Sequence, residues 1–218
     1  VLTPLVDEDG VKLITPAQNI SIVLTTHHIT TPEDFAIFDA LDRNDLPTVM
    51  DFVSDNERKG VFRGINAVNE HGTSAFMVAC RRPVMQVVAA FLNARRPRLD
   101  VNFAKPSGHS ALHYSIEAPT IDVTQALLRR GADPNKAITS PNLDLDGMTV
   151  LHFACKGEKL KHTRTLLSFG ADPHAKSTKG LSPLEVLPRD STSRTHFGKV
   201  FREAELANGN ERSSKKEL

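Results

Sequence analysis

The stretch Ser110-Ala111-Leu112-His113, followed eighteen residues later by Gly131-Ala132-Asp133-Pro134-Asn135, decides the fold of this 218-residue chain. Gly108 and Ser110 favour a turn with positive φ followed by a hydroxyl N-cap, so a helix is expected to begin there. Pro119 must end that helix early. A second apolar stripe from Ile121 to Leu128 then runs into the closing glycine. The predicted unit is a short helix, a tight turn, a longer helix and a loop.

The same unit recurs along the chain. Its opening returns as Gly147-Met148-Thr149-Val150-Leu151-His152, and its close returns as Gly170-Ala171-Asp172-Pro173-His174. Further openings begin at Gly72 and Gly180. The four opening glycines lie 36, 39 and 33 residues apart, which indicates a repeat of about 33 residues with insertions in loops.

From Thr31 to Ala207 the chain resembles the ankyrin-repeat family, whose pattern is a glycine turn, T-P-L-H-x-A, paired leucines and a Gly-Ala-Asp-x-Asn close. The resemblance implies an all-α solenoid of stacked helix-turn-helix units with β-hairpin-like loops. It implies about four to five repeats, including a degenerate first and a capping last. Several copies depart from the pattern: the proline is replaced by Ala75, Ala111 and Val150, and the histidine by Met77 and Glu185.

We expect three regions. Residues 1–31 form an N-terminal extension that caps the first repeat, and its short β-branched runs at residues 11–14 and 20–24 form either extended segments or a hairpin. Residues 32–207 form the repeat domain, and residues 208–218 form a disordered polar tail. The repeats are expected at about 32–66, 67–102, 103–135, 136–174 and 175–207. The charged loop from Ser54 to Arg63 in the first repeat is interpreted as a solvated connection or a contact loop.

Composition sets no strong bias toward a charged partner. The chain carries 27 basic and 26 acidic residues, for a formal net charge of +1, so nucleic-acid binding is not expected. Cys80 and Cys155 align at a small, buried position of the repeat and are predicted to be reduced core thiols. A reducing compartment fits them, so a cytoplasmic or nuclear location is expected.

A second location remains open. The ending Lys215-Lys216-Glu217-Leu218 resembles the Lys-Asp-Glu-Leu retrieval address, and Asn19-Ile20-Ser21 is a glycosylation sequon, which together indicate the endoplasmic-reticulum lumen as the alternative. No apolar run is long enough to span a membrane. The sequence starts at Val1 and not at methionine, which is expected of a fragment or of a processed product.

No residue pattern indicates catalysis or a metal or cofactor site. His113 and His152 occupy the T-P-L-H position, which the resemblance assigns to a structural hydrogen bond between repeats. No phosphate loop, H-E-x-x-H pattern or serine elbow occurs. His27 and His28 lack nearby ligands, and Asp144-Leu145-Asp146-Gly147 lacks the rest of a calcium loop.

The resemblance places variable, partner-binding positions at the loop tips and on the outward side of the first helices. The matching candidates are Glu70, His71, Thr73, Arg81, Arg82, Ser107, His109, Glu117, Leu143, Leu145, Asp146, Met148 and Lys156. The arginines form either a solvated face or an anchor for an acidic partner. The leucines of the 136–146 insertion either contact a partner or pack on the base of their own loop.

The function expected from these observations is a non-catalytic, monomeric module that binds a partner protein or peptide, with an acidic segment as one option, across the concave groove. The alternative is a regulatory or targeting domain of a larger protein, such as an enzyme, of which this chain is a fragment.

Overall fold

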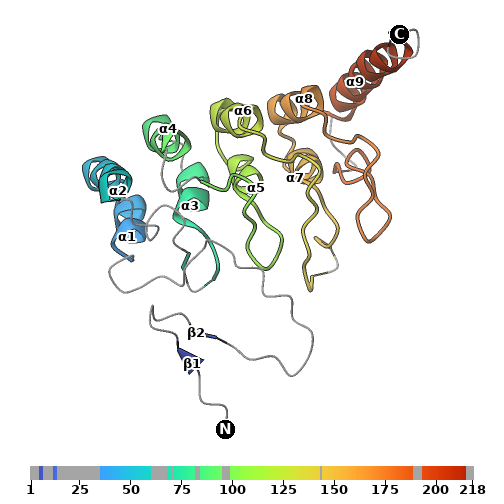
Figure 1. Ribbon diagram of the computed structural model, residues 1–218. Coiled ribbons are helices and arrows are strands. Elements are labelled where there is room, and N and C mark those ends of the chain that lie inside the picture. Colours follow the sequence, from blue (N-terminus) through green and yellow to red (C-terminus); the bar gives the residue numbers. More distant parts are fainter. Residues whose placement is uncertain are drawn as a thin grey trace.

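The computed structural model describes residues 5–6, 12–13, 35–59, 68–69, 71–81, 84–94, 99–142, 144–188 and 193–214. Its helices pack in pairs along one axis (Figure 1). The elements are α1 (Phe35–Arg43), α2 (Leu46–Lys59), α3 (Ala75–Arg81), α4 (Met85–Asn93), α5 (Ala111–Ser115), α6 (Asp122–Arg129), α7 (Val150–Lys156), α8 (Leu160–Ser168) and α9 (Arg194–Ser214), with strands β1 (Leu5–Val6) and β2 (Lys12–Leu13).

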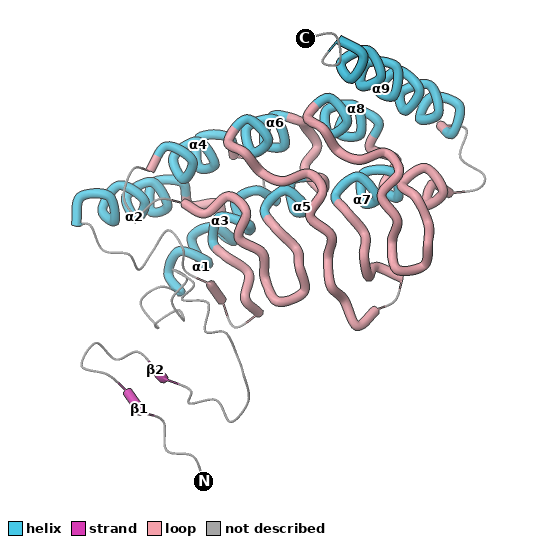
Figure 2. Tube along the Cα trace, turned by 45° about the vertical axis from the view of Figure 1, so that its right-hand side comes forward, coloured by secondary structure: helices cyan, strands magenta, loops and turns pink. Residues whose placement is uncertain are grey.

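The helices form two rows. An inner row runs through α1, α3, α5 and α7, and an outer row through α2, α4, α6 and α8, with each helix contacting its neighbours in the row. Loops that we call fingers project from the inner row (Figure 2). They lie at residues 68–74, 104–110, 137–149 and 177–181, and the first three close with isolated antiparallel bridges. This arrangement confirms the all-α repeat solenoid.

Helices α5 and α7 each begin directly after the hydroxyl residue at the capping position of the repeat. Ser110 and Thr149 adopt extended backbone, and each makes a reciprocal capping box with the histidine three residues later. In this box the Nδ1 atom of His113 accepts from the amide of Ser110 at 3.2 Å. The short first helix of the repeat follows from sequence, since α5 ends at Ser115, four residues before Pro119.

The core lies between the two rows. Leu127 and Leu166, the paired leucines of α6 and α8, are fully buried, as are Phe91 of α4 and Val123 of α6. Burying one such leucine stabilises the array by roughly 1.5–3 kcal/mol. A repeat standing alone would leave these side chains partly in water, so the units are stable only when stacked.

Asparagines at the close of the repeats link each unit to the next. The Asn102 amide donates to the Gly131 carbonyl at 3.0 Å and accepts from the Asp133 amide at 2.8 Å. Asn135 repeats both bonds one unit later, to the Gly170 carbonyl at 3.0 Å and from the Asp172 amide at 2.7 Å. Where the next asparagine would stand, the chain has His174, whose imidazole lies 3.3 Å from the Glu205 carboxylate of α9.

We expect Asn135→Ala to lower the free energy of unfolding by about 1–2 kcal/mol, because it removes both inter-repeat hydrogen bonds at once. Asn135→Asp keeps the acceptor for the Asp172 amide and loses only the donor, so its loss should be smaller. Equilibrium urea unfolding of the three proteins measures the difference. Equal losses for the two variants would show that the bond from the Asp172 amide contributes nothing.

Two helical boundaries differ from the sequence-based expectation. Helix α2 continues to Lys59, into the loop expected from Ser54, and α9 continues to Ser214, beyond the expected end of order at Ala207. Once packing has nucleated a helix, extending it through polar residues that include no proline costs little per residue. The tail from Lys215 onward lies outside the described residues.

The described residues of the last repeat include no inner helix. Residues 183–186 form consecutive turns, and α9 packs against α8 to end the array. Glu185 stands at the histidine position and accepts from both the amide and the hydroxyl of Ser182, at 2.7 and 2.6 Å. These bonds, with the Lys176 ammonium, lower the pKa of the Glu185 carboxyl to about 2.

The described part of the N-terminal extension contains one pair of short strands. Strands β1 and β2 pair antiparallel, with Leu5 opposite Leu13. The other expected extended run, residues 20–24, lies outside the described residues, so the capping role of the extension stays a prediction.

Candidate partner-binding groove

A cluster of rings lies where the inner helices meet the fingers. The His109 ring of the 104–110 finger lies 5.6 Å from His113 and 6.4 Å from Tyr114, both on α5. Phe153 of α7 reaches the same point, with its ring 5.8 Å from His109 and 5.6 Å from His113. The repeat places these residues together because a finger precedes each inner helix and the next inner helix stacks alongside.

These rings line an open hollow of about 290 Å³. Its floor is closed by Ile116 and His113, which are buried, while His109, Tyr114 and Phe153 are half-buried. The Lys105 ammonium lies 5.7 Å above the Tyr114 ring in a cation–π contact. Glu117, Gly157 and Lys159 complete the rim.

Two of the predicted binding residues contact each other. The guanidinium of Arg81, at the end of α3, lies 3.9 Å from the Glu117 carboxylate just beyond α5, and both side chains are about half exposed. Lys156, at the end of α7, is exposed. Arg81, Glu117 and Lys156 therefore come from three consecutive repeats and lie at matching positions of the inner row.

The long finger of residues 137–149 is held by its own aspartates. Asp146 accepts from the amide of Ser140 at 2.9 Å and from the Thr178 hydroxyl of the next finger at 2.6 Å, and these bonds lower the pKa of its carboxyl. Asp144 forms an ion pair with Lys179, which lowers its pKa as well. Asp146 thus joins two fingers, and Leu145 is half-buried.

Thr73 and Met148 require a correction. Their side chains are only 7% and 4% exposed, so neither presents a surface to a partner. Each directly follows an opening glycine, at the base of its finger, where the chain turns inward to begin the inner helix. Glu70, Arg82 and Leu143 lie outside the described residues. His71 is exposed, and the Ser107 hydroxyl pairs with Nδ1 of His109 at 2.9 Å.

Sequence reasoning missed Lys105, Tyr114 and Phe153. Each looks like an ordinary loop or helix residue, and only their shared face of consecutive repeats brings them together. The sequence did contain one signal: an aromatic residue directly follows each capping histidine, namely Tyr114 and Phe153.

The resemblance implied a hydrogen bond between repeats for His113 and for His152, and among the described residues only His152 makes one. Nε2 of His152 bonds to the Leu181 carbonyl of the next repeat at 3.0 Å. Nε2 of His113 is buried and has no hydrogen-bond partner within the described residues. Burial raises the pKa of the Cys155 thiol to about 12 and raises that of Cys80 too, so both are unreactive thiols in the core.

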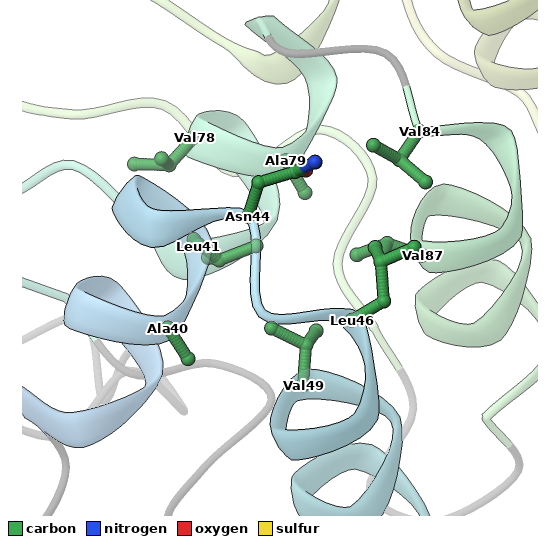
Figure 3. A pocket seen from close by; sticks show the side chains of 9 residues that line it. All are labelled: Ala40, Leu41, Asn44, Leu46, Val49, Val78, Ala79, Val84 and Val87. Atoms are coloured by element: carbon green, nitrogen blue, oxygen red, sulfur yellow. The ribbon is translucent and has the colours of Figure 1, made fainter.

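A second hollow lies between the first two repeats and does not suit a ligand. It is lined almost entirely by apolar side chains of α1, α2, α3 and α4, with Asn44 at its edge (Figure 3). Its volume of about 10 Å³ holds at most one water molecule. It is a packing defect at the junction of the degenerate first repeat.

Among the described residues, no helix is long and apolar enough to cross a membrane. A search of curated proteins found no match for the chain. Family models do match: three copies of the ankyrin repeat over residues 37–138 and one further ankyrin repeat over residues 146–178. Ankyrin repeats are generally protein–protein interaction modules, and the family is typically non-catalytic. The matched segments cover more than half of the sequence, and the chain therefore belongs to the ankyrin-repeat family.

Proposed function

We propose that this chain is a non-catalytic module that binds a protein partner across the inner groove, the surface formed by α3, α5, α7 and their fingers. The observation that carries the proposal is the division of labour within each repeat. Paired leucines, capping histidines and closing asparagines are occupied in stacking the array. The side chains left to meet a partner, such as Arg81, Glu117 and Lys156, are exposed along one face.

Cross-linking tests the proposed face. The chain would be incubated with lysate of its native cells and treated with a lysine-reactive cross-linker. Lys105, Lys156 and Lys159 border the groove, whereas Lys161 and Lys199 are exposed on α8 and α9. We expect partner cross-links at the first set. Cross-links concentrated on the second set would place the partner on α8 and α9 and contradict the groove.

Charge reversal of Arg81, at the end of α3, and of Arg82, the next residue in the sequence, tests whether these arginines anchor acidic groups. We expect Arg81→Glu combined with Arg82→Glu to reduce the captured partner about tenfold, since arginine binds carboxylates through two parallel hydrogen bonds. The melting temperature should change little, because an exposed ion pair such as Arg81–Glu117 is worth about 0–1 kcal/mol. If the double variant captures as much partner as the parent protein, the arginines do not anchor the partner.

A further inference from the structure

The open hollow between the third and fourth repeats has a chemistry more specific than the groove as a whole. Its walls are the rings of His109, Tyr114 and Phe153, with Ile116 below them. At about 290 Å³ it lies at the lower limit of the roughly 300–1,000 Å³ of sites that hold drug-sized ligands. The hollow therefore has room for one large side chain and is too small for most cofactors.

The charges around the hollow favour an acidic occupant. Among the described residues, its lining includes Lys105, Lys159 and one acidic residue, Glu117. The Glu117 carboxylate is already paired with Arg81 at 3.9 Å. The rim therefore carries uncompensated positive charge over an apolar interior.

We propose that this hollow binds one apolar side chain, of the size of leucine, from an acidic peptide segment whose carboxylates contact Lys105 and Lys159. The apolar side chain displaces water from the three rings, and the flanking carboxylates meet the two ammonium groups. A buried apolar anchor surrounded by complementary charge is the usual form of an energetic hot spot. This inference rests on the proposed function and specifies its partner.

The chain carries its own probe for this site. Tyr114 is the only tyrosine and there is no tryptophan, so intrinsic tyrosine fluorescence reports on the wall of the hollow. The full chain would be titrated to millimolar concentration with the acetylated, amidated peptide Glu-Asp-Leu-Asp-Glu. We expect a saturable change in fluorescence. The peptides Glu-Asp-Ala-Asp-Glu and Lys-Lys-Leu-Lys-Lys should each bind at least tenfold more weakly, because the first lacks the anchor and the second reverses the charge.

Paired charge reversals supply the matched control. The double variant Lys105→Glu with Lys159→Glu should bind the peptide Glu-Asp-Leu-Asp-Glu at least tenfold more weakly. Lys161→Glu with Lys199→Glu makes the same change in net charge at exposed positions of α8 and α9 and should leave binding unchanged. Circular dichroism of each variant checks that it is folded.

Several results would overturn the proposal: no saturable change with the acidic leucine peptide, equal binding of either comparison peptide, or equal effects of the two double variants. These outcomes differ from failure of the proposed function. If partner cross-links stay on the groove lysines while the peptide does not bind, the groove stands and the hollow does not contribute. If cross-links move to α8 and α9, the groove itself is wrong.

Discussion

Gly108→Ala should lower the free energy of unfolding by about 2–5 kcal/mol. Gly108 sits at the tip of the 104–110 finger with φ of +78°, where a residue with a Cβ atom is strained by roughly 1–2 kcal/mol. The added Cβ would also lie 2.6 Å from the Cα of Ile138 and 2.7 Å from the backbone nitrogen of Thr139. These are atoms of the next finger's backbone, so one finger must move away from the other.

Gly131→Ala is the matched control. Gly131 has a similar φ of +85°, yet a Cβ there would meet no atom within 4 Å. Its loss should be limited to the conformational strain, about 1–2 kcal/mol. Equilibrium urea unfolding of both variants isolates the contribution of close finger packing as their difference. If the two variants lose the same free energy, the fingers do not depend on this contact.

The same contact recurs one repeat later, which provides a replicate. A Cβ at Gly147 would lie 2.6 Å from the backbone nitrogen of Thr178 in the following finger. Both sites also lose a finger-to-finger hydrogen bond when the backbones separate, from Thr139 to the Ser107 carbonyl and from Thr178 to the Asp146 carbonyl. Gly147→Ala should therefore resemble Gly108→Ala and not Gly131→Ala.

Finger packing also connects stability to the proposed binding site. Gly108 is adjacent to His109, whose ring forms one wall of the hollow. The Ser107 hydroxyl lies 2.9 Å from Nδ1 of that ring and so fixes its position. A displaced finger moves the ring away from Tyr114 and Phe153. Gly108→Ala should weaken binding of the peptide Glu-Asp-Leu-Asp-Glu even at temperatures where the variant is fully folded.

The fold was predictable from sequence because its determinants are local and repeated. The glycine at each opening, the hydroxyl after it and the paired leucines each specify one feature, and each occurs in several copies. The four opening glycines adopt φ between 69° and 78°. Ser110 and Thr149 cap the helices that their positions predicted. The fold prediction therefore holds even where one copy departs from the pattern, because the neighbouring copies keep it.

The site was less predictable because its residues meet only through stacking. Phe153 is 44 positions from His109, and the 136–146 insertion separates their repeats, so sequence spacing gives no sign of the 5.8 Å contact between the two rings. Met148 shows the opposite error. Variable positions in a repeat need not be exposed, and Met148 is only 4% exposed.

The departure of the last repeat illustrates how one role can pass to a different residue type. Glu185 replaces the capping histidine and makes the same two bonds to Ser182 through a carboxylate. A glutamate at this position satisfies the hydroxyl and the amide as imidazole does, which is the usual form of a capping box. Among the described residues, Glu185 makes no hydrogen bond to another repeat. No such bond is needed here, because α9 ends the array.

Acid should unfold the protein through its buried histidines, and His113 should contribute most. Burial, with smaller effects from His109 and Lys136, lowers the pKa of His113 from 6.5 to about 3. Its Nδ1 accepts from the Ser110 amide, which cannot reverse its role, so protonating Nδ1 breaks the capping box. Below pH 6.5 the folded protein thus binds fewer protons than the unfolded chain. The free energy of unfolding must therefore decrease as the pH is lowered.

The expected loss is about 2 kcal/mol between pH 7 and pH 5 from His113 alone, since each unit below the unfolded pKa costs about 1.4 kcal/mol. The contribution is complete above pH 6.5 and is lost progressively down to about pH 3. The pKa of His152 is also lowered by burial, so it adds to the loss in the same direction.

His113→Gln isolates this effect, because glutamine can accept from the Ser110 amide in a capping box and does not titrate. Urea unfolding at pH 7 and pH 5 should show the drop in stability reduced by about 2 kcal/mol relative to the parent. His196→Gln, at an exposed position of α9, should leave the drop unchanged. Because the comparison uses the change with pH, any loss of stability that glutamine causes at pH 7 cancels. An undiminished drop in His113→Gln would mean that His113 is protonated in the folded protein at pH 5, and that its burial does not keep the ring neutral.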